Sequence, residues 1–336
     1  MLDKEVKYSY NDIMIRPCRL SFINSRTECN VLDENKKLPI FTAPMSNVVD
    51  MYNYDLFDKY GIYPILPRNI DLQTRYNYAI SGKWAAFSLH EFCEHFCNEY
   101  NMLNYPARVL IDIANGHMKR LYDAVKYAKS INGNNIIIMA GNIAEPSTYE
   151  EAYNAGVDYI RVGIGGGNGC LTSSNTGIHY PMASLLNEMY YKKSELTKDK
   201  NKKFPYIIAD GGIRNYSDVI KALALGADYV MIGSLFSQLQ DSCAKIIIYD
   251  GIPYKEFYGM ASEKGQIDIN GKKAKTSEGV CKLLPVTTTI EKWVDNMASY
   301  LRSAMSYTGI EDIKDFNAAN VFCNVISKNT QDSLNK

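Results

Sequence analysis

One cysteine follows five glycines in the segment GIGGGNGC, which spans residues 163–170. Glycines permit positive φ and let backbone carbonyls and amides approach a ligand or an ion closely. A thiolate on such an open loop can act as a nucleophile. A cysteine is more often a small buried thiol, but the glycines and the lack of apolar neighbours favour Cys170 as a nucleophile. Thr172, two residues further on, is the nearest hydroxyl side chain.

Two more segments, ADGGI at 209–213 and IGS at 232–234, place glycine directly after an apolar run. The unhindered amides of Gly212, Gly233 and Ser234 suit a phosphate group. Asp210 precedes its glycines, and a carboxylate there can accept two hydrogen bonds from a ribose diol. A tight turn would explain either segment alone, whereas their occurrence after successive strands favours a phosphate site.

Other polar motifs are less specific. Asp112 ends the apolar run in IDIANGH, where it can orient a ligand or relay a proton. Considered alone, Glu278 in KTSEG is predicted to be an ordinary surface carboxylate. Cys93 and Cys97 flank His95, but C-x3-C is not a standard zinc spacing, so ordinary packing is the favoured interpretation.

The composition narrows the classes of protein. The 336 residues are 46% hydrophobic and carry 37 basic and 37 acidic side chains, which excludes wholesale disorder. A neutral chain has no general attraction for nucleic acid or an anionic membrane, and no apolar run approaches bilayer length. The polar N-terminus predicts no secretory signal, so we expect a cytoplasmic protein whose eight cysteines are reduced.

Eight apolar runs alternate with segments of helical periodicity, and some of these helices end in glycine. This order predicts an α/β fold in which eight strand–helix units form a single (β/α)8 TIM barrel over residues 1–336. A doubly wound open sheet is the alternative, but eight evenly spaced strands favour closure. The predicted strands are residues 38–45, 62–67, 84–89, 108–114, 135–142, 159–165, 206–212 and 229–234.

Two long intervals interrupt the alternation. A Cys loop covers about 163–181, and a polar stretch predicted to be a mobile flap covers about 257–285, before the last helix and a C-terminal tail at about 317–336. Both intervals follow predicted strands and therefore emerge at the C-terminal rim, where barrel active sites lie. Long loops in compact domains are usually functional or disordered, and this position favours function.

From about residue 8 to 316 the chain resembles the IMP dehydrogenase/GMP reductase family. The resemblance rests on YSYNDIMIRP, SRTECN, TAPMSNVVD, GNIAEPSTYEEAYNAGVDYIRVGIG, the Cys loop with TGIHYP, ADGGI, MIGS, FYGMASE and SEG, in family order. It implies a purine nucleotide at the barrel mouth, with Cys170 bonded to C2 of the base. It also implies that Thr172 and Glu278 relay a proton.

The resemblance assigns the remaining site residues as well. Those implied to bind the substrate are Asp210, Gly211, Gly212, Gly233, Ser234, Gly259, Met260, Ala261, Lys275, Ser277 and Gly279. Those implied to bind or lie near a dinucleotide are Ser25, Arg26, Arg68, Asp112, Ile164, Gly165, Tyr307 and Gly309. Backbone carbonyls of Gly165, Gly167 and Cys170 resemble a monovalent-cation loop, which implies K⁺.

Three features favour the reductase branch. Only 16 residues separate the second and third predicted strands, too few for the regulatory module of two CBS repeats that dehydrogenases usually carry. Residues 261–276 contain neither the Arg nor the Tyr that dehydrogenases use to activate water. The segments ANGH and FYGM resemble the reductase versions. The implied activity is NADPH-dependent deamination and reduction of GMP to IMP and ammonia, by a homotetramer in which Tyr307 to Gly309 reach a neighbour's cofactor site.

The alternatives are an IMP dehydrogenase that lacks the CBS module and oxidises IMP with NAD, and a non-catalytic barrel that senses nucleotide. The chain departs from the family pattern at Asn168, Ser173, Ala261 and Lys275, where Ser, Arg, Ser and Arg are usual. Replacing Arg by Lys removes a bidentate fork. These positions therefore bear on phosphate binding, cation dependence and purine preference.

Overall fold

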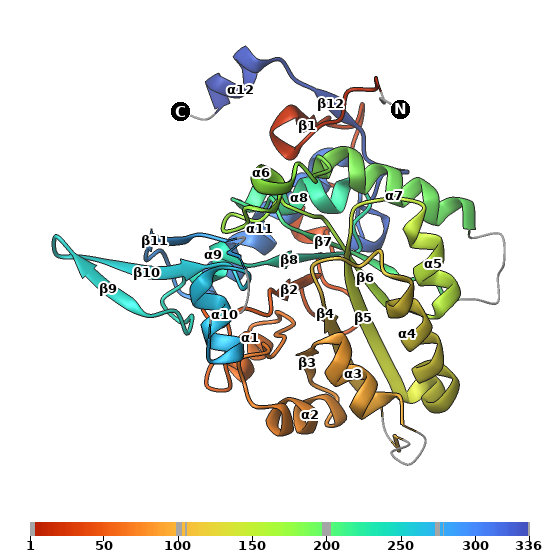
Figure 1. Cartoon of the computed structure of the whole chain (residues 1–336). Helices are drawn as coiled ribbons and strands as arrows, with labels where there is room; N and C mark the ends of the chain where they lie inside the picture. Colours follow the sequence, from red (N-terminus) through yellow and green to blue (C-terminus); the bar gives the residue numbers. More distant parts are fainter. Residues whose placement is uncertain are drawn as a thin grey trace.

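The computed structural model describes residues 4–98, 103–104, 106–196, 203–272, 276–277 and 279–334. Its core is a curled parallel sheet of seven strands (Figure 1). Across the sheet the order is β2 (Ile40–Thr42), β8 (Tyr229–Ile232), β7 (Tyr206–Asp210), β6 (Tyr159–Val162), β5 (Ile136–Ile143), β4 (Ala107–Asp112) and β3 (Trp84–Phe87). Each lies within, or overlaps, a predicted apolar run, so seven of the eight predicted strands are confirmed.

The eighth predicted strand, residues 62–67, forms two isolated parallel bridges instead of a ladder. Tyr63 pairs with Phe41 on β2, and Leu66 pairs with Ala85 on β3. The segment reads IYPILP, and its two prolines, Pro64 and Pro67, have no N–H to donate to a ladder. It nevertheless joins the two edge strands of the sheet, which is consistent with a TIM barrel.

The helices follow the strands as the periodicity predicted. They are α1 (Tyr54–Lys59), α2 (Leu72–Ile80), α3 (Leu89–Phe96), α4 (Lys119–Asn132), α5 (Thr148–Ala155), α6 (Thr172–Thr176), α7 (Met182–Leu196), α8 (Tyr216–Ala224), α9 (Ser234–Ser237), α10 (Glu263–Asn270), α11 (Ile290–Thr308) and α12 (Lys328–Leu334). Among the described residues, every helix is too short or too polar to cross a lipid bilayer.

Side chains alternate between the two faces of the sheet, and both faces are buried. Val109, Ile138, Ile160 and Ile207 belong to the larger apolar cluster, which includes residues of the surrounding helices. Their strand neighbours Leu110, Met139 and Ile208 belong to a second, smaller cluster with Phe41 and Trp84. Burial on both faces explains why these strands read as continuous apolar runs.

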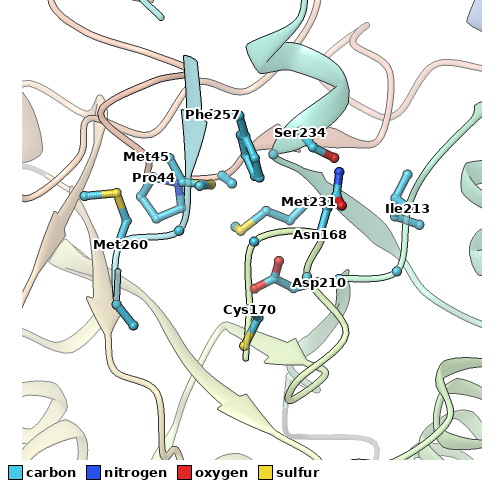
Figure 2. Close-up of a pocket in the computed structure, with 18 of the residues that line it drawn as sticks. Pro44, Met45, Asn168, Cys170, Asp210, Ile213, Met231, Ser234, Phe257 and Met260 are labelled. Carbon is cyan, nitrogen blue, oxygen red and sulfur yellow. The ribbon is translucent and has the colours of Figure 1, made fainter. Parts of the chain in front are cut away.

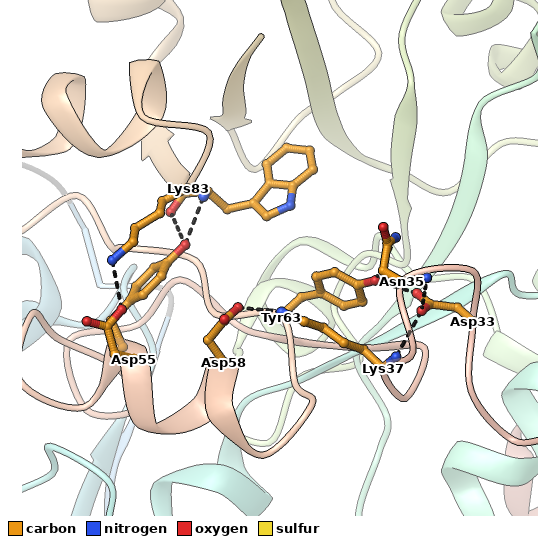
Figure 3. A network of polar contacts seen from close by, with 9 residues as sticks. Asp33, Asn35, Lys37, Asp55, Asp58, Tyr63 and Lys83 are labelled. Atoms are coloured by element: carbon orange, nitrogen blue, oxygen red, sulfur yellow. Dashed lines mark hydrogen bonds and ion pairs between the residues drawn. The ribbon is translucent and has the colours of Figure 1, made fainter. Parts of the chain in front are cut away.

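The N-terminal end of the sheet is filled by aromatic rings. Tyr159, Tyr206 and Tyr229 begin neighbouring strands and contact one another, with ring centroids 5.0–5.7 Å apart. Tyr63 Oη donates a 2.5 Å hydrogen bond to Asp33, and Tyr229 Oη donates a 3.3 Å bond to the same carboxylate oxygen. Figure 3 shows the network around Asp33 and Tyr63. The hydroxyls of Tyr63 and Tyr229 thus share one acceptor at this end of the sheet.

Two small sheets lie outside the core. β1 (Ile13–Ile15) pairs antiparallel with β12 (Cys323–Val325), so the predicted C-terminal tail has regular structure and joins the N-terminal segment. β9 (Ile246–Tyr249), β10 (Ile252–Tyr258) and β11 (Cys281–Pro285) form an antiparallel sheet that projects from the molecule in Figure 1. The stretch predicted as a flap is therefore the end of β10, α10 and β11. Its mobility stays a prediction.

Candidate active site

A cavity of about 230 Å³ opens at the C-terminal ends of the core strands. It brings together residues from β2, β4, β6, β7, β8, the Cys loop and β10 (Figure 2). The lining residues are Ala43, Pro44, Met45, Asp112, Arg161, Gly167, Asn168, Gly169, Cys170, Asp210, Gly211, Gly212, Ile213, Met231, Gly233, Ser234, Phe257, Gly259, Met260 and Ala261. Most of the predicted substrate residues thus share one cavity.

Cys170 lies at this cavity with a hydroxyl and an amide beside its sulfur. The thiol donates to Thr172 Oγ1 over 3.2 Å, and the Thr172 backbone N–H donates to Sγ over 3.5 Å. The sulfur therefore has a hydroxyl acceptor and an amide donor within hydrogen-bond distance. The predicted pairing of Cys170 with Thr172 is therefore present as a contact.

Close backbone contacts hold the Cys loop against the residues that follow β10 and precede β11. Cys170 forms an antiparallel bridge with Gly279, and Val280 N–H donates to the Gly169 carbonyl over 3.0 Å. A Cβ added to Gly259 would lie 2.9 Å from the Gly169 carbonyl oxygen, a distance that side chains do not tolerate. Ser277 Oγ donates to the Gly279 carbonyl over 3.0 Å. Glu278 and Lys275 lie outside the described residues.

Arg161 connects two carboxylates at the base of the cavity. Its Nη1 donates to Asp112 over 2.6 Å, and its Nε and Nη2 donate to Asp210 over 3.0 and 2.8 Å. Asn142 Nδ2 donates to the same Asp210 oxygen over 2.7 Å. Burial lowers the pKa of Arg161, but Asp210 and Asp112 outweigh it and raise that pKa. The three bonds to Asp210 all use its Oδ2, so Oδ1 remains available to a ligand within the described structure.

The sequence analysis missed Arg161 and Asn142. A signal was present for Arg161, because it is the one charged side chain in the otherwise apolar run YIRVGIG. Strand alternation places Tyr159 and Arg161 on the same face of β6, with Tyr159 packed among the inner rings and Arg161 at the cavity. Asn142 carried no distinguishing signal, since asparagine after a strand is a common turn residue.

Not every predicted phosphate amide is available. Gly212 N–H already donates to the Gly166 carbonyl over 2.8 Å. The amides of Gly233 and Ser234 have no acceptor in the described part of the chain, and neither has the Ser234 hydroxyl. Ser234 is 8% exposed. The Gly212 amide is therefore used inside the fold, whereas the donors of Gly233 and Ser234 after β8 remain available to an anion.

The predicted dinucleotide residues divide into two groups. Arg68 Nη1 donates to the carbonyl of the cavity residue Asp112 over 3.5 Å, while the buried Arg68 Nε lies 4.0 Å from Glu91 Oε2 in an ion pair. Ser25, Arg26, Tyr307 and Gly309 do not line the cavity. Tyr307 is 70% exposed, and its carbonyl accepts from Cys18 N–H beside Gly309.

Two of the three carbonyls predicted to bind a cation, those of Gly165 and Gly167, accept hydrogen bonds inside the loop. Ser173 Oγ donates to the Gly165 carbonyl over 3.2 Å, and Cys170 N–H donates to the Gly167 carbonyl over 3.0 Å. The His179 ring nitrogen Nδ1 lies 3.0 Å from the Ile164 carbonyl. Among the described residues, no group of three or more His, Cys, Asp or Glu side chains is placed to hold a metal ion.

The remaining cysteines behave as predicted. All eight are unpaired thiols within the described residues. Cys97 is partly buried on the α3 side of the core and donates to the Ala124 carbonyl over 3.4 Å. Burial, reinforced by Cys93, raises the pKa of Cys97 to about 12. This thiol is therefore neutral at ordinary pH, which fits packing better than metal binding.

Comparison with known proteins shows the family to which this chain is similar. Residues 104–335 match the family described as the IMP dehydrogenase / GMP reductase domain. The chain is 30% identical to the GMP reductases of Streptococcus equi subsp. equi and Lactobacillus delbrueckii subsp. bulgaricus, with 96% of each chain covered. It is 32% identical to the GMP reductase of Streptococcus pyogenes serotype M49, with 91% of each chain covered. The chain therefore belongs to the IMP dehydrogenase/GMP reductase family of oxidoreductases.

Proposed function

We propose that this protein catalyses the NADPH-dependent reductive deamination of GMP to IMP and ammonia. The observation that carries the proposal is the position of Cys170, which lines a cavity with Asp210 and Ser234 and contacts Thr172. Its relatives named GMP reductase support the choice of reaction over the other branch of the family. Residues 261–276 also lack the Arg and Tyr of a water-activating flap.

The cavity suits a nucleoside monophosphate. Asp210 Oδ1 can accept from a ribose diol, while Arg161 and Asn142 fix the carboxylate through its other oxygen. The free amides of Gly233 and Ser234 and the Ser234 hydroxyl can donate to a phosphate. With the ribose and phosphate held there, the base extends toward Cys170 and toward Gly259 and Met260, which follow β10.

The chemical step forms and breaks bonds at C2 of the purine. The Cys170 thiolate adds to C2, and the C2–N bond breaks once the leaving nitrogen has received a proton, because an unprotonated amide-like nitrogen leaves poorly. Thr172, in contact with Sγ, is placed to pass that proton. Glu278 is its proposed partner, next to Gly279, which bridges Cys170. In this step C2 loses its amino group as ammonia and gains the bond to sulfur.

When bound, NADPH supplies the hydride that replaces sulfur at C2 and regenerates the thiolate. The residues present fit a dinucleotide beside the cavity, because the Arg68 guanidinium lies next to Asp112 and its side chain is 25% exposed, so it can pair with an anionic group of the cofactor. Ile164 and Gly165 complete this side in the proposal. Ser25, Arg26, Tyr307 and Gly309, which do not line this cavity, would serve a neighbouring subunit's cofactor. The homotetramer, the K⁺ ion and the cytoplasmic location remain predictions of the resemblance.

The test is a turnover assay. Protein, GMP and NADPH are mixed, the nicotinamide absorbance is followed, and IMP and ammonia are measured as products, with K⁺ present or absent. We expect one IMP and one ammonia for each NADPH oxidised. A parallel reaction with IMP and NAD measures the dehydrogenase alternative. NADH formation there, without NADPH oxidation by GMP, would refute the proposal.

A further inference from the structure

The charges around the cavity do not match a phosphate ligand. Among its described lining residues the ionic side chains are Asp112, Asp210 and Arg161, and Arg161 is already paired with both carboxylates. The lining therefore carries a net negative charge, whereas a nucleotide phosphate is an anion. Hydrogen-bond donors alone would bind it without compensating its charge. A cation is needed close to the donors that follow β8.

Lys282 is that cation. It lies on β11, and the antiparallel register pairs it with Phe257 on β10, so both side chains lie on the same face of the small sheet. Phe257 is 3% exposed and lines the cavity. The register therefore directs Lys282 toward the cavity from a strand that the sequence analysis assigned to the flap.

The contact of Lys282 with the Cys loop is specific. Its Nζ donates to the Asn168 carbonyl over 2.8 Å and to Asn168 Oδ1 over 3.0 Å. Because Oδ1 faces the lysine, the Asn168 Nδ2 group is turned away from it, and it has no acceptor in the described part of the chain. Asn168 and Ser234 both project into the cavity in Figure 2. One lysine thus orients a free donor and adds a positive charge behind it.

We propose that Lys282, acting through Asn168, is a specificity-determining residue for the phosphate of the nucleotide substrate. The inference rests on the proposed function for the identity of that nucleotide. Asparagine at position 168 suits this role, because its side-chain oxygen accepts from Lys282 while its separate NH2 group can donate to a ligand. Lys282 is a positioning residue, because it touches Asn168 and not the reacting atoms.

The experiment compares ligands with and without phosphate. Binding of IMP and of inosine to the full-length protein is measured by calorimetry for the wild type, Lys282→Met and Lys282→Arg. We expect Lys282→Met to weaken IMP binding about tenfold, the effect of one charge-assisted contact at a partly exposed site. Inosine binding should be unchanged, and Lys282→Arg should retain much of the IMP affinity. Lys245→Met, an exposed lysine preceding β9 in the same sheet, is the matched control.

Kinetics separate this inference from the proposed function. With GMP and NADPH, Lys282→Met should raise KM about tenfold with little change in kcat, and the variant's KM should depend less on salt. Equal losses of IMP and inosine affinity would assign Lys282 a purely structural role and overturn the inference, as would unchanged IMP affinity. No GMP turnover by the wild type, with phosphate-dependent binding intact, would overturn only the reaction. A wild type that binds no IMP would overturn both.

Discussion

Arg161 sets the charge state of the cavity base. Its side chain is 9% exposed and contacts Asp112 and Asp210, which end strands β4 and β7. A buried charge without a partner is strongly unfavourable, and each carboxylate here compensates the guanidinium. The carboxylates are fixed in return, because a planar guanidinium can bond both at once. Arg161 therefore orients Asp210, the proposed acceptor for the ribose hydroxyls, and links it to Asp112, which lies beside the proposed cofactor residues.

Cys170→Ala should abolish turnover while leaving the cavity intact. Removing a covalent nucleophile typically lowers kcat by about a thousandfold or more, whereas nucleotide binding depends on Asp210, Ser234 and the loop amides. NADPH oxidation measures the first quantity, and calorimetry with IMP measures the second. Cys93→Ala, on α3 and outside the cavity lining, is the control and should retain activity. Undiminished turnover by Cys170→Ala would refute covalent catalysis by this residue.

The Cys loop is positioned by its contact with β10. The loop has little side-chain volume, and its backbone approaches Gly259 so closely that neither Gly169 nor Gly259 has room for a Cβ. Since β10 also carries Phe257 into the cavity, the loop and the strand act as one wall of the site. Displacing either element would move Cys170 relative to the base.

Gly259→Ala should therefore impair catalysis more than binding. Its Cβ would lie 2.9 Å from the Gly169 carbonyl oxygen and would force the loop and strand apart. Misplacing a nucleophile by a fraction of an ångström to one ångström can cost about tenfold to a hundredfold in rate, which would be measured as kcat/KM for GMP. Gly167→Ala is the control, because its Cβ would meet Cys170 Cβ at an ordinary 3.6 Å. Equal losses in the two variants would contradict this account of the loop.

The start of α3 carries a pH-dependent contact. Glu91 accepts from Ser88 N–H in the N-terminal cap and forms an ion pair with buried Arg75 at 2.7 Å. Burial raises the pKa of Glu91, but the hydrogen bonds from Arg75 and Ser88 outweigh it and lower that pKa from 4.5 to about 2. The stabilisation is thus fully present above the ordinary pKa of glutamate and is lost as the pH falls toward 2.

Glu91→Gln should remove this pH dependence. The shift corresponds to about 3 kcal/mol of unfolding free energy at neutral pH. Urea unfolding of both proteins should show a large advantage of the wild type at pH 6 that shrinks steadily toward pH 3. Glutamine can still cap the helix, so the variant should fold. Glu94→Gln, at an exposed position on the same helix, should show no such trend. A wild-type advantage that does not change with pH would contradict the assignment.

At the scale of the whole molecule, the sheet has two chemically different ends. The N-terminal end contains packed aromatic rings, and the hydroxyls of Tyr63 and Tyr229 both donate to Asp33. The C-terminal end carries Asp112, Asp210 and the Cys loop. The segment 62–67 joins β2 and β3 through only two bridges, so Tyr63, on this segment, contributes to closure through its side chain as well as its backbone.

Tyr63→Phe should lower stability without affecting the chemistry. The variant loses the 2.5 Å bond to Asp33 and the 3.0 Å bond from Asn35, for an expected cost of about 1–3 kcal/mol in unfolding free energy. Tyr229→Phe loses only a 3.3 Å bond and should cost less. Urea unfolding measures both, and kcat for GMP should be unchanged because the cavity is at the other end. A larger loss of unfolding free energy in Tyr229→Phe than in Tyr63→Phe would contradict the proposed ranking of the two hydroxyl groups.

The sequence alone predicts the strands of the core sheet and the helices between them, and it indicates Cys170 as the proposed nucleophile. Apolar runs and helical periodicity are local signals, so seven strands and the helices between them follow from neighbouring residues. The glycines around Cys170 and after β7 and β8 are also visible in the sequence, although the backbones that approach several of them come from distant segments. The C-terminal end of a parallel sheet then collects these segments without further information.

Only the tertiary structure decided how these segments complete one another. Arg161 is 49 residues from each of its two partners, Asp112 and Asp210, and Lys282 is 114 residues from Asn168. Such pairings depend on strand order, register and the inward or outward direction of each side chain, none of which is written in the local pattern. In the tertiary structure the Gly212 amide donates to the Gly166 carbonyl, and the segment 62–67 pairs with its neighbours through two bridges. Local composition fixes which groups are present, and long-range packing fixes which of them remain free to bind.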